Sequence, residues 1–247
     1  MSDLDRAIDR LYEVFRAYEL PASVPYCDHC HDESEVVLVR STKLRDLGPE
    51  DIGHQVFDLV STFGDLETFK YLLPRILEIT VRQGWADAGS AVDLPIVFGK
   101  FAHATWSTWP PHEREAVQDW VQALWIQALA REPGEWPDRE PGDVLVGLGR
   151  AYDSLAPFLA EWETFPTSHA AEHLARYVLG HSIQLRKKGT LGGAFWGDRP
   201  EVEAQVLRWL RSARVLERLE AFSGTDAFED WDRSQLDVAL DVLRGPA

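Results

Sequence analysis

The apolar residues of this 247-residue chain recur at intervals of three and four along almost its whole length. Residues 4–18, 66–81 and 112–131 show the pattern most clearly, because each segment would place its apolar side chains on one stripe of a helix. No run of residues alternates between apolar and polar as a half-buried strand would. We therefore predict an all-α protein, an irregular multi-helix array of about nine or ten helices with little or no β structure.

Proline, glycine and capping residues divide this helical pattern. Further helices are expected at 143–163, 168–187, 200–222 and 234–244. The short apolar segment Glu35–Val39 fits a strand or a helix, and Pro74 predicts a kink or a restart within its helix. Residues 132–142 (EPGEWPDREPG) are rich in proline, glycine and charge, as linkers are. We expect one helical domain over residues 1–247, with its candidate subdomain boundary at 132–142.

The charge balance restricts the partners of the chain. Lysine and arginine number 25 and aspartate and glutamate 41, so the formal net charge is −16. Nucleic acids and anionic membranes are bound through clusters of basic residues, so neither is an expected partner. A basic protein partner is expected instead, because an acidic surface attracts one at long range.

Three sequence features predict a cytoplasmic protein. The first fifteen residues carry charge at every helical turn, which is unlike a secretory signal. The sequence contains no stretch of 18 apolar residues, which is about the length that a membrane-spanning helix needs. Two cysteines are too few for a disulfide framework, so a reducing compartment is expected.

The densest group of reactive side chains is the segment Cys27-Asp28-His29-Cys30-His31. Two thiolates three residues apart can bind Zn²⁺ with the imidazole of His31 as third ligand. His29 could take the place of His31, and a distant group such as His54 would have to complete a tetrahedral site. The same C-x-x-C-H pattern is also that of a c-type haem attachment site, of a redox-active dithiol and of an inert loop. The sequence leaves these alternatives open.

A second, weaker metal-site candidate is the segment His169-Ala-Ala-Glu172-His173, which has the H-x-x-E-H form of the inverzincin peptidases. On a helix, His169 and His173 share one face and could hold Zn²⁺ beside Glu172 as general base. The motif is short, and inverzincins resemble α+β proteins, which this chain does not. The alternative is two histidines on a partly exposed helix face. The sequence therefore assigns no catalytic residue here.

Six segments of the chain are similar to a widespread family of uncharacterised bacterial all-helical proteins. They are residues 25–35 (PYCDHCHDESE), 43–52 (KLRDLGPEDI), 61–79 (STFGDLETFKYLLPRILEI), 116–129 (AVQDWVQALWIQAL), 192–210 (GGAFWGDRPEVEAQVLRWL) and 213–222 (ARVLERLEAF). The resemblance implies a helical fold and a bacterial cytoplasmic setting. It implies no activity and transfers no site residue, because no function is established for that family.

Three functional hypotheses follow, one of which is a cytoplasmic dithiol switch at Cys27 and Cys30. The first is a protein-binding or regulatory module with an acidic surface, for example an inhibitor or immunity-like protein that acts on a basic partner. The alternative is a zinc-binding protein or metal-dependent hydrolase that uses the Cys27/Cys30 loop or the His169/Glu172/His173 helix. Because no nucleophile signature is present, a binding module is expected before an enzyme, and zinc is the one cofactor that the motifs suggest.

Overall fold

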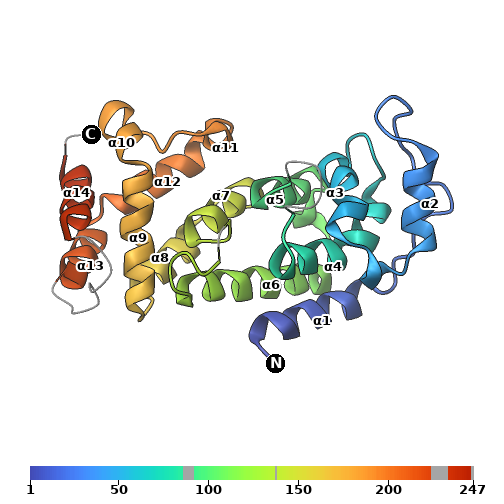
Figure 1. The fold of residues 1–247 in the computed structure, drawn as a ribbon, viewed down its shortest axis with the longest axis horizontal. Coiled ribbons are helices and arrows are strands. Elements are labelled where there is room, and N and C mark those ends of the chain that lie inside the picture. Colours follow the sequence, from blue (N-terminus) through green and yellow to red (C-terminus); the bar gives the residue numbers. More distant parts are fainter. Residues whose placement is uncertain (86–91, 137, 224–232, 246–247) are drawn as a thin grey trace. The chain divides into compact units, whose positions relative to one another are not determined.

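A computed structural model describes residues 1–85, 92–136, 138–223 and 233–245. These residues form fourteen α-helices and no strand, and their only β pairing consists of two isolated bridges, Tyr26 with Phe63 and Leu59 with Phe63 (Figure 1). The all-α prediction is confirmed. None of the described helices is both long and apolar enough to cross a membrane.

The helix count exceeds the predicted nine or ten because three expected helices are interrupted. Residues 143–163 contain parts of α7 (Pro141–Ala151) and α8 (Ala156–Thr164), and residues 168–187 contain α9 (Ser168–Gly180) and most of α10 (Ser182–Lys188). Residues 200–222 likewise separate into α12 (Pro200–Leu210) and α13 (Ala213–Ser223). Each interruption is only one to four residues long. Apolar spacing continues across such short turns, so periodicity alone does not reveal them.

The chain divides into two compact units, Met1–Leu124 and Trp125–Ala247. The division falls within helix α6 (Pro111–Ala130), and the proline-rich segment 132–142 belongs to the second unit.

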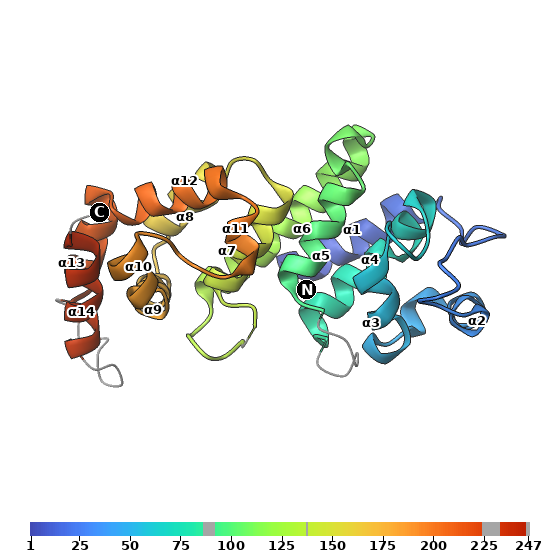
Figure 2. The ribbon, with the colours of Figure 1, turned by 90° about the horizontal axis from the view of Figure 1, so that it is seen from above.

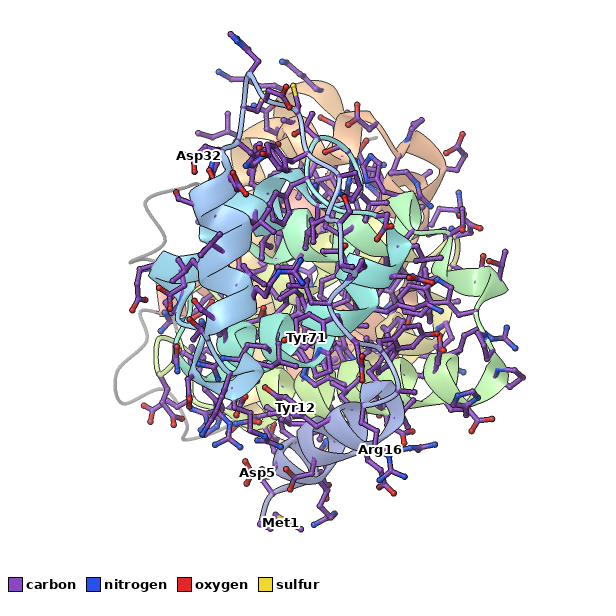
Figure 3. The ribbon with its side chains drawn as sticks, turned by 90° about the vertical axis from the view of Figure 1, so that its right-hand side faces the viewer. Met1, Asp5, Tyr12, Arg16, Asp32 and Tyr71 are labelled. Atoms are coloured by element: carbon purple, nitrogen blue, oxygen red, sulfur yellow. The ribbon has the colours of Figure 1, made fainter. Side chains whose placement is uncertain are left out.

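The first unit is built around α4 (Leu66–Arg82), whose residues from Thr68 to Val81 are buried except for half-buried Tyr71. Helix α4 runs unbroken through Pro74 and packs against α1 (Asp3–Phe15). The unit also contains α2 (Glu33–Ser41), α3 (Pro49–Asp58), α5 (Leu94–His103) and two short 3₁₀ helices, Leu44–Asp46 and Trp106–Thr108. The ambiguous segment Glu35–Val39 is thus helical. Figure 3 shows the side chains of this unit, with Asp32 at the start of α2 and Met1 and Asp5 at the opposite end.

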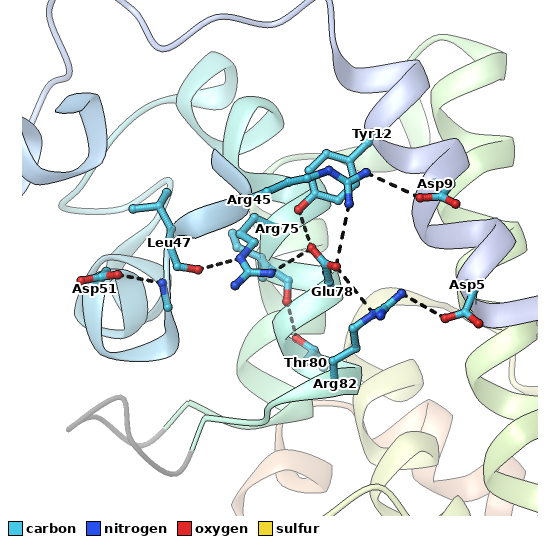
Figure 4. Close-up of polar contacts among 12 residues, drawn as sticks. Asp5, Asp9, Tyr12, Arg45, Leu47, Asp51, Arg75, Glu78, Thr80 and Arg82 are labelled. Atoms are coloured by element: carbon cyan, nitrogen blue, oxygen red, sulfur yellow. Dashed lines mark hydrogen bonds and ion pairs between the residues drawn. The ribbon is translucent and has the colours of Figure 1, made fainter. Parts of the chain in front are cut away.

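A polar network joins α1 and α4 within this unit (Figure 4). The buried carboxylate of Glu78 accepts a hydrogen bond from the Tyr12 hydroxyl at 2.7 Å and pairs with Arg75 Nη1 at 2.9 Å. Arg82 Nε lies 3.6 Å from the other Glu78 oxygen and also reaches Asp5 of α1 at 3.0 Å. Burial alone would raise the pKa of Glu78, but these hydrogen bonds and arginine charges outweigh it, so the pKa is lowered. The network is therefore held by an ionised buried carboxylate.

The second unit has a tryptophan-rich core. Trp162 stacks edge-on against Trp125 and tilted against Trp209, with ring centroids 5.6 and 5.3 Å apart. Helix α9 packs against α7, α13 and α14 (Arg233–Arg244), as Figure 2 illustrates. The short α11 (Ala194–Gly197) buries Trp196 against α7 and α12. All four tryptophans are buried, so they serve core packing.

Candidate metal centre

The loop that carries Cys27–His31 is fastened to the turn that follows α3. Cys27 N–H donates to the Thr62 carbonyl at 2.9 Å, and Gly64 N–H donates to the Pro25 carbonyl at 2.7 Å. In the same turn Val60 has φ +62°, a left-handed conformation that a β-branched residue adopts only under strain. The contacts hold the loop and the end of α3 together, although the bonded residues lie 35 and 39 positions apart in the sequence.

Within the loop, a tight turn directs His31 inward. The N–H groups of Cys30 and His31 both donate to the Cys27 carbonyl, at 2.9 and 3.0 Å. Asp32 then caps α2 by accepting from the Ser34 N–H at 2.8 Å. Cys27 and Cys30 remain exposed, whereas the side chain of His31 has no exposed surface and packs against the Phe63 ring at 5.1 Å.

Glu35 on α2 connects two histidines through their Nδ1 atoms. One carboxylate oxygen lies 2.8 Å from His31 Nδ1, and the other lies 3.5 Å from His54 Nδ1 on α3. Gln55 Nε2 donates a further hydrogen bond to Glu35 and so orients the carboxylate. An Nδ1–H donated to a carboxylate leaves the Nε2 lone pair free to bind a metal, and metal-binding histidines commonly have such a partner.

The Nε2 atoms of both histidines meet at Asp58, the last residue of α3. Asp58 Oδ2 lies 3.1 Å from His31 Nε2 and 3.7 Å from His54 Nε2. The three candidate ligand atoms all lie within 4.8 Å of one another. Metal bonds of 2.0–2.1 Å at tetrahedral angles put neighbouring ligand atoms about 3.3 Å apart. The two separations from Asp58 Oδ2, 3.1 and 3.7 Å, lie on either side of this value, so the group is close to the spacing that a zinc ion requires.

The buried His31 Nε2 makes no hydrogen bond, although Asp58 Oδ2 is 3.1 Å away. A deprotonated Nε2 and a carboxylate oxygen are both acceptors, so their contact is repulsive unless a cation or a proton lies between them. A buried polar atom without a hydrogen bond costs about 1–3 kcal/mol. A metal ion would satisfy this nitrogen and the carboxylate together.

Lys100 of α5 provides one positive charge beside this group. Its ammonium donates to the Phe57 carbonyl, one residue before Asp58. Burial lowers the pKa of Lys100, and the negative charge of Asp58 acts in the opposite direction. The ammonium therefore screens Asp58 in part while its hydrogen bond goes to the backbone.

The two thiols do not converge on the same point as His31. Among the described residues, the convergent group that includes His31 consists of His31, His54 and Asp58. A hydrogen bond from the His29 N–H and a second interaction with Cys30 lower the pKa of the Cys27 thiol. The contact with Cys27, together with the charge of Asp58, raises the pKa of Cys30. The structure thus separates the predicted Cys27, Cys30 and His31 set, and joins His31 to the predicted fourth ligand, His54.

Sequence reasoning missed Asp58 and Glu35. Each lies four residues after one of the two histidines, as His54 to Asp58 on α3 and His31 to Glu35 at the start of α2. The i, i+4 spacing of both pairs was therefore visible in the sequence, although only His54 and Asp58 lie within one helix. What the sequence could not show is that the loop at residues 25–27 bonds to the 62–64 turn and so brings the two pairs together.

The second predicted metal group has a structural role. His169 Nδ1 lies 3.2 Å from the Ala130 carbonyl, and His173 Nε2 lies 3.0 Å from the Arg131 carbonyl. These carbonyls end α6 and lack helical partners, so the imidazoles satisfy them. Glu172 pairs with Arg176 at 2.7 Å. Burial lowers the pKa of His173, which favours the neutral ring.

An open groove of about 840 Å³ in the second unit offers less chemistry. It is lined by the connection between α8 and α9 and by α13. Three of its charged groups have partners: Arg214 pairs with Glu163 at 3.1 Å, and Arg218 donates to the carbonyls of Glu163, Phe165 and Thr167. The groove does not direct a converging set of ligands at one point.

Comparisons with models of protein families, with curated proteins and with solved structures give no significant match. The resemblance to a bacterial helical family therefore stays a prediction, and functional inference depends on the geometry of the site.

Proposed function

We propose that this protein binds one divalent transition-metal ion, with zinc as the first candidate, through His31, His54 and Asp58. The observation that carries the proposal is the orientation of both imidazoles, whose Nδ1 atoms face Glu35 and whose Nε2 atoms face Asp58. Two imidazoles and a carboxylate are ligands of intermediate character that suit zinc, whereas calcium and magnesium prefer oxygen ligands alone.

The ligand number suggests which activity to assay. Three protein ligands leave one position of a tetrahedral site for water, and catalytic zinc sites share this arrangement. Structural zinc sites normally supply four protein ligands. Two histidines and one carboxylate also suit Fe²⁺, so iron should be measured with zinc. Hydrolysis is the first reaction to test, because zinc lowers the pKa of bound water to about 7.

The main competing interpretation is a buried ion-pair network without metal. In that case His31 would donate one N–H to Glu35 and the other to Asp58. The missing hydrogen bond at Nε2 argues against this interpretation, since a proton on Nε2 should lie in line with its acceptor. The two interpretations differ in whether the metal-free protein binds added metal.

The test is metal content and affinity, measured on untagged protein purified without a chelator. We expect about one zinc per chain and a saturable titration of the metal-free protein with Zn²⁺. His54→Ala and Asp58→Asn should abolish high-affinity binding, while removal of half-buried His169 by His169→Ala serves as the matched control and should leave it intact. The side chain of His54 is 52% exposed, so its removal should leave the fold intact. The absence of saturable binding, or equal affinity in all three variants, would refute the proposal.

We also propose a basic protein partner, on the independent evidence of the net charge of −16. The association should be steered by charge, so its rate should fall as salt shortens the Debye length. The test compares proteins retained by the immobilised chain at low and high ionic strength. Retained proteins without a basic bias, or binding that ignores salt, would contradict this proposal.

A further inference from the structure

Cys27 and Cys30 are the only cysteines in the chain, and the structure places them at the two ends of one tight turn. The Cys30 N–H donates to the Cys27 carbonyl at 2.9 Å, which closes a four-residue turn. Such turns bring their first and fourth Cα atoms within about 7 Å, and disulfides usually span Cα separations of about 4.4–6.8 Å. The backbone is therefore already shaped for a disulfide.

The two side chains also lie against each other. Each is close enough to interact with the other, and the backbone N–H groups of His29 and Cys30 lie near the Cys27 sulfur. In thiol–disulfide exchange one sulfur attacks and a second resolves the mixed disulfide, so two sulfurs on one closed turn suffice for both steps. Both thiols are exposed, so a small disulfide in solution can reach them.

The turn is held in place from both sides. Cys27 donates to Thr62, the bridge between Tyr26 and Phe63 precedes it, and the capped start of α2 follows it. A rigid turn keeps the two sulfurs together at a high effective concentration. It also keeps them apart from the candidate metal ligands, because neither sulfur belongs to the convergent group of His31.

We propose that Cys27 and Cys30 form a reversible redox site that exchanges with low-molecular-weight disulfides, separately from the metal centre. The Cys27 thiolate attacks one sulfur of a disulfide such as glutathione disulfide, forms a mixed disulfide and releases one glutathione thiolate. The Cys30 thiol loses its proton and attacks the Cys27 sulfur, which releases the second glutathione thiolate. Two protein thiols are oxidised to one disulfide, one glutathione disulfide is reduced to two thiols, and the two protons pass to the leaving thiolates.

The test is equilibration of the folded protein with mixtures of reduced and oxidised glutathione, followed by acid quenching and mass spectrometry. The expected product is a chain lighter by two hydrogen atoms, which can only be the Cys27–Cys30 disulfide because no other cysteine exists. Cys30→Ser and Cys27→Ser should each stop at a mixed disulfide with glutathione, because the second sulfur that resolves it is missing. The two variants are matched controls for the need for both sulfurs.

The denatured chain provides the reference for the role of the turn. The disulfide should form with an equilibrium constant at least about tenfold larger in the folded chain than in denaturant, because the folded turn already holds the sulfurs together. Equal constants, or a folded chain that resists oxidation under conditions that oxidise the denatured chain, would overturn the proposal.

A zinc arm separates this proposal from the metal site. The zinc-loaded protein should still form the disulfide, because the sulfurs are not predicted ligands. Suppose instead that zinc blocks oxidation, and that the Co²⁺-loaded protein shows a sulfur-to-metal absorption band that is lost in the cysteine variants. The thiols are then metal ligands, and the separate redox site is wrong although metal binding stands. Without any zinc binding, the metal proposal fails and the redox result is unaffected.

Discussion

Glu35 allows the sharpest test of the candidate metal centre, because its position is that of a residue that orients ligands and is not one itself. Its two oxygens face the Nδ1 atoms of His31 and His54, at 2.8 and 3.5 Å. The change Glu35→Gln keeps the shape of the side chain but replaces one acceptor oxygen by an amide donor. One of the two imidazoles must then face an N–H group, and so loses the partner that fixes its tautomer.

The expected loss of zinc affinity follows from the loss of one hydrogen-bond acceptor by one imidazole. Loss of an outer partner of a metal-binding histidine typically weakens metal affinity by about 10–100-fold, which corresponds to about 1.4–2.7 kcal/mol. Glu35→Gln should therefore still bind one zinc per chain, with a Kd raised by that factor. Asp58→Asn, which changes a proposed ligand, should weaken binding by more than Glu35→Gln does.

The assay is a competition titration of Zn²⁺ between the protein and a chromogenic chelator, with His169→Ala as the control for general effects of altered histidine content. Unchanged affinity in Glu35→Gln would mean that the Glu35 contacts do not orient the imidazoles. A loss as large as that in Asp58→Asn would make Glu35 a ligand. Either result would refute the assignment of Glu35 as the orienting residue.

Three further predictions concern buried charges. Lys70 and Glu113 form a buried ion pair at 2.6 Å, so Lys70→Met should lower the free energy of unfolding, measured in urea, by about 3–5 kcal/mol. Adding Glu113→Gln should recover part of this loss, because it removes the unpaired buried charge. Losses that simply add in the double variant would contradict this prediction. The lowered pKa of Glu78 contributes stability that is present above its unfolded pKa, about 4.5, and lost as pH falls, so Glu78→Gln should show a shallower acid decline in urea titrations than the wild type. Burial also lowers the pKa of His173, so its contribution is full above about pH 6.5 and is lost on acidification. His173→Gln should remove that part of the decline between about pH 7 and 5, and an unchanged slope would count against the neutral buried ring.

The fold class could be predicted from the sequence because helical periodicity is repeated in almost every segment. Helix ends were harder to predict, since they depend on local capping that leaves apolar spacing unchanged. The interruption between α9 and α10 is a single residue, His181, whose imidazole bonds to the Leu191 carbonyl at 2.7 Å. That partner lies ten residues further along the chain, so no local sequence pattern predicts the contact. Pro74 illustrates the converse, because packing maintains α4 where propensity predicts a break.

Only part of the candidate site could be predicted from the sequence, because the tertiary contacts that assemble it leave no local pattern. The dense segment at residues 27–31 predicts a group of metal ligands, and His54 is its predicted distant ligand. The assignment of both thiols to the same site followed from their adjacency in the sequence, which says nothing about side-chain direction. The two i, i+4 pairs, His31 with Glu35 and His54 with Asp58, are individually common and gain meaning only when tertiary contacts bring them together.

Adjacent residues in this loop meet opposite environments, and this difference supports two separate chemistries. Cys30 is exposed, whereas the next side chain, that of His31, has no exposed surface. Thiolates favour soft metals and disulfide exchange, whereas imidazole with carboxylate favours zinc and similar ions. The turn at the Cys27 carbonyl produces the difference, since it bonds to the N–H groups of both Cys30 and His31 and then reverses the chain into α2. The loop is bonded to a turn in which Val60 has a strained backbone conformation. Such strain is commonly found at functional sites, which agrees with a use for the two exposed thiols and for the buried histidine.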